Sequence, residues 1–345
     1  MSTGNRTSAL TGTTGGLYSI FTNDSQCPDR FRVHAPSNVH EIPNCHYPTS
    51  HHPLHIVHVS GVSHPGSGIF VDEQGQIYFT DTGEGVWMSD AKRVLTLFST
   101  SAVHWMAHSE EGRFAQAPEK FGAFERITPT GAKPVLFVCS EFPCAFGKDG
   151  NLYYADRREG MPIIRRTPEG KESVLAGEPA AATVFRTVTG IAAGPDDSLY
   201  IVDIDQESGD HAVLKIAMNG KVSTFSSGFL NAYRREKSER GDCCRGLAVD
   251  PHGNVFVAGT DRRCIVKITP QGKTSLALQA TKPWYPTGVT IFRDELYVLE
   301  YTDMPPGWNP EDRKGWVPRV RKVERNGNAI IVATVPRQDS ILRPK

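Results

Sequence analysis

Three histidines of this sequence lie beside short apolar segments, where an imidazole could take part in chemistry. His64 and His104 come just before such segments, and His108 comes at the end of one. Imidazole is the side chain whose unperturbed pKa lies closest to neutrality, so it can act as a general base or bind a transition metal. We therefore take His104 and His64 as candidate catalytic bases, and His64, His104 and His108 as candidate metal ligands.

An arginine and a glutamate complete the candidate catalytic set. Arg245 directly precedes the segment that opens at Gly246, where a long cation could hold an anionic group or a developing oxyanion. A structural ion pair with an acidic neighbour is the alternative for this arginine. Glu300, or Asp205, would orient the base or bind a metal. Mixed charges and aromatic rings suit a small polar ligand, and the candidate substrate-binding residues are Arg186, Asp205, Tyr285, Tyr301 and Trp308.

The elements that must position these residues repeat along the chain. The segment CAFGKDGNLYYAD returns in similar form as GLAVDPHGNVFVAG about a hundred residues later. Each unit has a short apolar strand, a polar turn, a second strand such as QIYFTD or SLYIVD, a third strand, a turn with glycine and a fourth strand. Four short strands without a helical period predict one antiparallel blade. We expect the turn glycines, such as Gly75 and Gly253, to have positive φ.

The number of units predicts the architecture. Six units, spaced 36 to 56 residues apart, open near Gly68, His104, Pro143, Gly190, Gly246 and Gly288. They predict an all-β, six-bladed β-propeller over residues 55–345. The second unit is the most degenerate. Residues 1–54 read as an N-terminal extension that could add strands, and seven blades remain an alternative if residues 13–62 form one. The segment LHIVHVSG (54–61) is expected to be an outermost strand that closes the ring against the last blade.

The repeat resembles a known family. The pattern P-x-G-[IL]-A-V-D-x-x-G-N-[VL]-[YF]-V-A, followed by I-x-K-I-T-P-x-G-K, is similar to the NHL repeat over residues 62–335. More broadly, it resembles the propeller superfamily that contains the senescence-marker/gluconolactonase enzymes, the strictosidine-synthase-like proteins and the amidating lyase. That resemblance implies hydrolases, lyases, a condensing enzyme and protein-binding modules alike, so it predicts the fold more sharply than the function.

The resemblance also bears on a metal cofactor. In gluconolactonase-like enzymes, the residues just before the innermost strands supply Glu, Asn and Asp ligands to a divalent metal. The corresponding residues here are Ser67, Val103 or His104, Phe142, Thr189, Arg245 and Thr287. The ligands of that family are absent, and an arginine at the place of an Asp would repel a dication. The amidating lyase implies zinc on several histidines, for which this chain offers His64, His104 and His108. The sequence therefore leaves a divalent metal as a possible cofactor.

Loops around the central channel should form the site. In a propeller, the loops that enter the innermost strands and those that leave the second strands share one face. Two long insertions, 230–246 and 300–318, belong to neighbouring blades five and six and could form a lid. Asp81, Asp156 and Asp203 recur at one repeat position and are expected to brace turns. The pair Cys243-Cys244 could be a vicinal disulfide or two adjacent thiols.

Composition limits the partners and the compartment. Thirty-eight basic and thirty-eight acidic residues give no net charge, so nucleic acid and membrane surfaces are not expected as partners. No apolar run is long enough to span a bilayer, and the N-terminus lacks signal-peptide features, which favours a cytoplasmic location. Seven cysteines without a C-x-x-C pair indicate buried thiols.

Together these features predict a soluble propeller enzyme, a hydrolase of lactones or esters or a lyase, that acts on a small polar molecule in the central top-face pocket. The alternative is a non-catalytic NHL-type propeller that binds a protein or another ligand through the same face. The absence of RING, coiled-coil or kinase segments favours the enzyme. A third possibility is a relative of these enzymes that has lost catalytic activity.

Overall fold

The computed structural model describes residues 65–177, 185–205, 208–233, 244–302 and 315–336, together with the backbone of two short strands near the N-terminus. The chain divides into two compact units, Met1–His58 and Val59–Lys345. In the first unit, β1 (Leu10–Thr11) and β2 (Leu17–Tyr18) pair as an antiparallel hairpin. The predicted outer strand at 54–61 lies outside the described residues.

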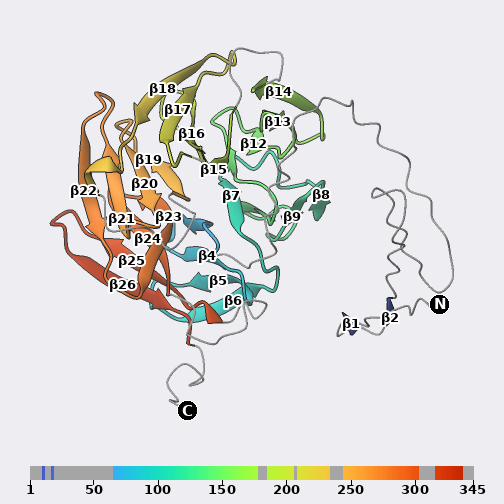
Figure 1. Ribbon diagram of the computed structural model, residues 1–345. Coiled ribbons are helices and arrows are strands. Elements are labelled where there is room, and N and C mark those ends of the chain that lie inside the picture. Colours follow the sequence, from blue (N-terminus) through green and yellow to red (C-terminus); the bar gives the residue numbers. More distant parts are fainter. Residues whose placement is uncertain are drawn as a thin grey trace, which may run out of the picture. The chain divides into compact units, whose positions relative to one another are not determined.

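The second unit contains six four-stranded antiparallel sheets, the blades of a propeller (Figure 1). Blade 1 has β3 (Ile69–Val71), β4 (Ile77–Asp81), β5 (Gly85–Ser89) and β6 (Leu95–Ser99), and blade 2 has β7 (Trp105–Ser109), β8 (Lys120–Phe121), β9 (Phe124–Arg126) and β10 (Val135–Cys139). Blade 3 has β11 (Cys144–Phe146), β12 (Leu152–Ala155), β13 (Ile163–Arg166) and β14 (Glu172–Ala176), and blade 4 has β15 (Val188–Ala193), β16 (Leu199–Ile204), β17 (His211–Ile216) and β18 (Val222–Ser227). Blade 5 has β19 (Leu247–Val249), β20 (Val255–Gly259), β21 (Cys264–Ile268) and β22 (Thr274–Gln279), and blade 6 has β23 (Trp284–Phe292), β24 (Glu295–Thr302), β25 (Pro318–Val323) and β26 (Ala329–Thr334).

The predicted six-bladed propeller is confirmed, and the seven-bladed alternative is wrong. The innermost strands β3, β7, β11, β15, β19 and β23 contact one another in sequence order, and β23 contacts β3. Across this closure, the Tyr301 hydroxyl donates to the Thr80 carbonyl oxygen at 2.6 Å. The outermost position of blade 6 is held by β26, which follows β25 directly in the chain. Blade 6 is therefore complete without an N-terminal strand at that position.

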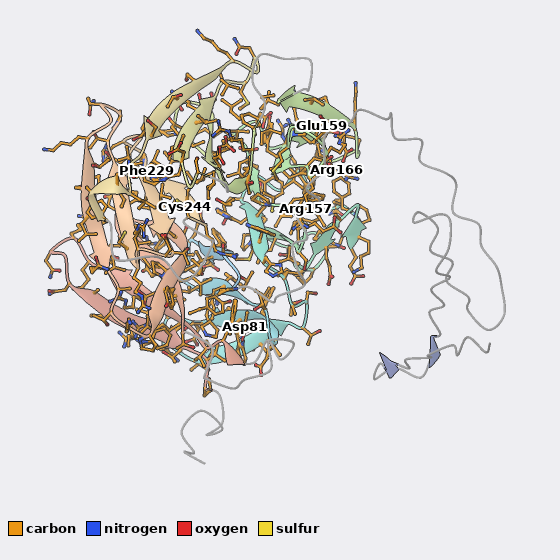
Figure 2. The ribbon with its side chains drawn as sticks, in the orientation of Figure 1. Asp81, Arg157, Glu159, Arg166, Phe229 and Cys244 are labelled. Atoms are coloured by element: carbon orange, nitrogen blue, oxygen red, sulfur yellow. The ribbon has the colours of Figure 1, made fainter. Side chains whose placement is uncertain are left out.

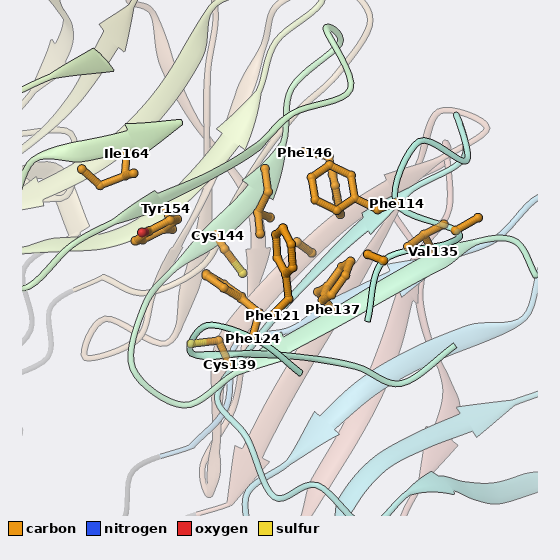
Figure 3. Close-up of a cluster of buried hydrophobic side chains, with 14 residues drawn as sticks. Phe114, Phe121, Phe124, Val135, Phe137, Cys139, Cys144, Phe146, Tyr154 and Ile164 are labelled. Carbon is orange, nitrogen blue, oxygen red and sulfur yellow. The ribbon is translucent and has the colours of Figure 1, made fainter. Parts of the chain in front are cut away.

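Blade 2 is wound differently from the others, which explains its degenerate repeat. Its order from the centre outward is β7-β10-β9-β8, whereas the other blades add their strands in sequence order. After β7, the chain runs to the outer edge and returns inward. The fully buried Phe114 fixes this route, because its ring packs against those of Phe121, Phe137 and Phe146 at centroid distances of 5.6, 5.7 and 5.0 Å (Figure 3).

Glycines recur for two different physical reasons. The turn glycines have positive φ as predicted, for example 80° at Gly75 and 78° at Gly253. The opening glycines instead allow neighbouring innermost strands to approach closely. A Cβ on Gly288 would lie 2.4 Å from the Ser67 carbonyl oxygen, and one on Gly246 would lie 2.8 Å from the Cα of Gly288. The innermost strands therefore begin at a narrow ring.

The rest of the described fold is strand, turn and loop. The single helical element among the described residues is a 3-10 turn at Asn231–Tyr233. None of the described segments forms a helix that is both long and apolar enough to span a membrane.

Candidate functional site

A central channel runs between the six innermost strands. It contains a cavity of about 290 Å³ whose walls are formed by all six of these strands. We call the face where the chain enters the innermost strands the upper face, and the face of the turns that follow those strands the lower face. The candidate catalytic residues His104 and Arg245 lie at the upper end of the channel.

The residues directly before the opening glycines, and those at the matching positions of blades 2 and 3, form a ring at that upper end, which we call the collar. The collar consists of Ser67, His104, Phe142, Thr189, Arg245 and Thr287. Hydrogen bonds link it around the ring: the Ser67 amide donates to the His104 carbonyl oxygen at 2.7 Å, and the Thr287 hydroxyl donates to the Gly66 carbonyl oxygen at 2.7 Å. The backbone thus holds five polar side chains at one level of the channel.

The environment of His104 fixes its tautomer. The side chain is buried, and Nδ1 lies 3.2 Å from the carbonyl oxygen of Ser140. A carbonyl oxygen can only accept, so Nδ1 carries the proton, and in the neutral ring Nε2 keeps its lone pair. This is the protonation pattern that a general base or a metal ligand requires. The sequence-based candidate therefore has a suitable tautomer. Nε2 itself is buried, and neither His104 nor Arg245 is among the residues that line the central cavity.

Arg245 crosses the upper end of the channel. Its side chain is buried, and Nη1 donates to the carbonyl oxygen of Pro65 at 2.9 Å. Pro65 leads into blade 1, so this arginine of blade 5 reaches past blade 6. Its backbone is fixed as well, because its amide donates to the Ala258 carbonyl oxygen at 3.0 Å. The guanidinium is therefore a positioned cation at the collar.

Two collar hydroxyls were not selected from the sequence. Ser67 Oγ and Thr189 Oγ1 are inaccessible to solvent and have no hydrogen-bond partner within the described parts of the chain. Both residues line the central cavity. Buried hydroxyls are normally satisfied by protein, water or a ligand, so these two groups have hydrogen-bonding capacity that no described residue uses. Both residues stand directly before an opening glycine, and this position in the repeat is the sequence signal by which they could have been found.

The charged residues of the blade 4 loops lie farther out. Arg186 is exposed and pairs with Asp205, with Nη1 and Oδ2 separated by 2.9 Å. Asp203 accepts hydrogen bonds from the Arg186 and Thr187 amides at 2.9 and 3.0 Å, so it braces the loop that enters β15. Asp81 likewise accepts from the Gly83 amide at 2.9 Å within its own turn. These contacts agree with the bracing role expected for the repeated aspartates.

Glu300 holds two arginines. Its carboxylate is fully buried, with Oε2 at 2.7 Å from Arg319 Nε and Oε1 at 2.5 Å from Arg321 Nη2. Arg319 also stacks over the Trp284 ring at 3.7 Å from the centroid. Burial lowers the pKa of Arg319, while the charge of Glu300 opposes that shift. Glu300 therefore acts on the arginines of β25, whereas the sequence suggested that it orients a histidine.

The two candidate tyrosines are packed between blades. Tyr301 is fully buried and makes the hydrogen bond to Thr80 described above. Tyr285 is buried beneath Arg263, whose guanidinium lies 4.0 Å from the ring centroid and donates to the tyrosine hydroxyl. Neither tyrosine lines the central cavity. Their proposed contact with substrate thus has no support from the cavity's lining.

His104 and His108 cannot share one metal ion. They precede and nearly end the same strand, β7, and four residues of extended chain span about 13 Å. Within the described residues, no group of three or more His, Cys, Asp or Glu side chains could hold a metal.

The candidates His64 and Trp308, like Cys243, lie outside the described residues. Cys244 is buried in the same apolar cluster as Phe229 (Figure 2).

His108 lies at the other end of the channel. Its ring stacks on that of Phe70, with centroids 3.7 Å apart and an interplanar angle of 22°. The side chain is accessible to the space inside the channel but surrounded by protein, and this desolvation lowers its pKa from 6.5 to about 4. His108 is therefore neutral near pH 7.

Comparisons with known proteins find similarity in the fold alone. No family model matches the chain, and no curated protein matches it. Similar solved structures include the virginiamycin B lyase from Staphylococcus aureus, with 15% identity over 80% of this chain and 85% of that chain and a TM-score of 0.46. They also include a luciferin-regenerating enzyme, with 14% identity over 72% and 88% of the two chains and a TM-score of 0.47. The calcium-binding protein regucalcin from Agrobacterium tumefaciens shares 12% identity over 77% and 72%, with a TM-score of 0.40. At this identity, nothing about substrate or site is carried over.

Proposed function

We propose that this protein is a propeller enzyme that acts on a small polar molecule at the collar, by hydrolysis of a lactone or ester or by lyase chemistry. The observation that carries the proposal is the combination, at one level of the channel, of a tautomer-fixed imidazole and a positioned cation. His104 and Arg245 are both collar residues, and both are buried. An acid–base group and a fixed positive charge are what proton transfer to or from a substrate with a developing negative charge requires.

The remaining collar residues support binding of such a substrate. Ser67 and Thr189 line the cavity, and their hydroxyls are buried without a hydrogen-bond partner among the described residues. A hydroxyl can donate as well as accept, so these two groups suit ester, lactone or alcohol oxygens. In the proposed reaction, His104 Nε2 removes a proton from water or from the substrate, and Arg245 stabilises the oxygen on which negative charge develops.

The experiment is a turnover assay on the purified full chain with a panel of lactones, esters and elimination substrates. The test variant is His104→Asn, because the asparagine amide retains a donor toward the Ser140 carbonyl oxygen while it removes Nε2. The matched control is His252→Asn, since His252 is exposed on a turn of the lower face. We expect at least a hundredfold loss of turnover in the first variant and none in the second.

Two outcomes would contradict the proposal. Turnover that survives unchanged in a folded His104→Asn variant would exclude His104 as the base. A protein without turnover on any class of the panel would favour the non-catalytic, NHL-type reading, and the search would move to protein partners.

A further inference from the structure

The central channel is a funnel that is accessible from its lower end. The residues that line its upper half, such as Ile69, Met106 and Leu247, are buried. Those that line its lower half, such as His108, Val249 and Ile291, are accessible to solvent. All six turns around the lower opening lie within the described residues, so this end of the channel can be examined completely.

His108 is the exception in the lower wall of the funnel. The residues at the corresponding position of the other five innermost strands are all apolar, namely Val71, Phe146, Ala193, Val249 and Ile291. Phe70 covers one face of the imidazole, as described above, and Leu136 pairs with His108 on the neighbouring strand. Neither ring nitrogen of His108 has a hydrogen-bond partner among the described residues. A neutral imidazole therefore offers an acceptor and a donor to whatever occupies the funnel.

Carboxylates surround the lower opening. The turns that follow the six innermost strands carry nine acidic and three cationic side chains, which are Asp72, Glu73, Glu110, Glu111, Asp149, Asp196, Asp197, Asp250 and Asp294, against Arg113, Lys148 and Arg293. The cationic side chains tie turns together: Arg113 donates to the Asp149 carbonyl oxygen at 2.5 Å and Arg293 to that of Glu73 at 3.1 Å. Arg165, Lys215 and Arg325, from outside these turns, pair with Asp149, Asp196 and Asp294. The negative field is therefore strongest beside blades 1 and 2, where Asp72, Glu73 and Glu110 make no ion pair among the described residues, and it raises the local concentration of small cations there.

The acidic groups nearest to His108 are crowded. Glu110 is two residues from His108 and makes no ion pair within the described parts of the chain. Burial raises its pKa, and the charges of Glu73 and Asp72 raise it further, while Lys133 lowers it. Asp72 is also occupied by its own turn, because Oδ1 accepts from the Gln74 and Gln76 amides at 3.0 and 2.8 Å. The like charges at this corner would be relieved by a cation.

We propose that the lower funnel binds a small alkylammonium ion, with the ammonium group at His108 and Glu110 and the alkyl stem directed up the channel between Val249 and Ile291. Each part of the guest meets a matching surface. The ammonium donates to the lone pair of a neutral imidazole and lies in the negative field of the rim, and the stem displaces water from an apolar wall. This site is separate from the collar and does not depend on the proposed reaction there.

The test is a titration of the full chain with n-butylammonium, followed through the His108 imidazole resonances by NMR at pH 7. n-Butanol and butyrate serve as neutral and anionic probes of the same length. We expect saturable binding of butylammonium, weaker binding of butanol and none of butyrate. Hexylammonium should bind more tightly, by up to about fourfold per added methylene.

Variants show whether the named residues form the site. His108→Leu, followed by calorimetry, and Glu110→Gln should each weaken butylammonium binding at least fivefold. The control Glu324→Gln lies in an outer turn of the lower face, and should leave binding unchanged. Equal binding of butanol and butylammonium, or unchanged affinity in a folded His108→Leu variant, would overturn the proposal. Calcium that shifts the His108 resonances at lower concentration than butylammonium would also overturn it, in favour of a metal site.

Discussion

Arg245 and Pro65 are joined across the first and fifth blades by a hydrogen bond of 2.9 Å from Nη1 to the carbonyl oxygen. The bond passes over the start of blade 6, whose Thr287 donates to Gly66 next to Pro65 in the chain. The same arginine is thus a structural tie at the ring closure and the cation proposed for the collar. These two roles can be separated by mutation.

Arg245→Lys keeps the charge but loses the planar donor geometry that reaches Pro65. We expect a modest loss of thermal stability, by a few degrees, and a drop in turnover of tenfold or more, because the cation is displaced from its position. Thermal unfolding and turnover measured on the same preparations check this. Full turnover in a variant with lowered thermal stability would leave Arg245 with the structural role alone.

Gly288→Ala tests the narrow ring. The added methyl would meet the Ser67 carbonyl oxygen at 2.4 Å, which is backbone of the neighbouring blade and cannot move aside easily. We expect a destabilisation of about 2–3 kcal/mol or more. Gly75→Ala is the matched comparison, since nothing lies within 4 Å of its Cβ position, and it should cost about 1 kcal/mol for the left-handed backbone. Urea unfolding of both variants measures the difference, and equal costs would contradict the close approach.

These glycines show what the sequence could predict. Gly68, Gly190, Gly246 and Gly288 marked four of the six blades, because only a repeat explains a glycine before each apolar strand. The same signal was missing in blades 2 and 3, where Trp105 and Pro143 stand at the level of the glycine, and blade 2 also has a different strand order. The ring contacts of Phe114 with Phe137 and Phe146 join segments that are far apart in the chain, so no local sequence pattern predicts them.

The candidate site was predicted less well than the fold, for a physical reason. Repeat position predicts that His104 and Arg245 stand just before innermost strands, and in the structure both are collar residues. It could not show that the Tyr301 side chain points into the contact between blades 6 and 1, or that Glu300 pairs with Arg319 and Arg321, which come 19 and 21 residues later. Side-chain direction depends on bulges, such as the register shift between Pro286 and Gly288, which the sequence does not reveal.

Glu300→Gln tests the buried ion pairs of blade 6. The substitution leaves Arg319 and Arg321 facing a neutral amide in a buried site, so we expect a loss of about 3 kcal/mol in the free energy of unfolding. Glu295→Gln is the control, because Glu295 pairs with Lys322 at 2.8 Å near the surface and should cost less than about 1 kcal/mol. Urea titrations of the two variants give the comparison. A loss as small as that of the control would mean that the arginines find other partners.

Acid should destabilise the protein through two histidines whose pKa is lowered in the folded state. Desolvation lowers the pKa of His108 to about 4 and also lowers that of His211, whose Nε2 accepts from the Leu230 amide at 3.0 Å. The unfolded chain therefore binds more protons than the folded one below pH 6.5. Their contribution to stability is complete above pH 6.5 and is lost as the pH falls toward 4.

The variant His108→Leu isolates one part of that dependence. We expect its urea midpoint to fall less than that of the unaltered protein between pH 7 and 4.5, while His211 still contributes. Glu110 acts in the opposite direction, because its pKa is raised in the folded state, so the difference between the two proteins is the quantity to compare. Parallel pH profiles would mean that His108 titrates normally, and would place the imidazole in bulk water and outside the desolvated wall of the funnel.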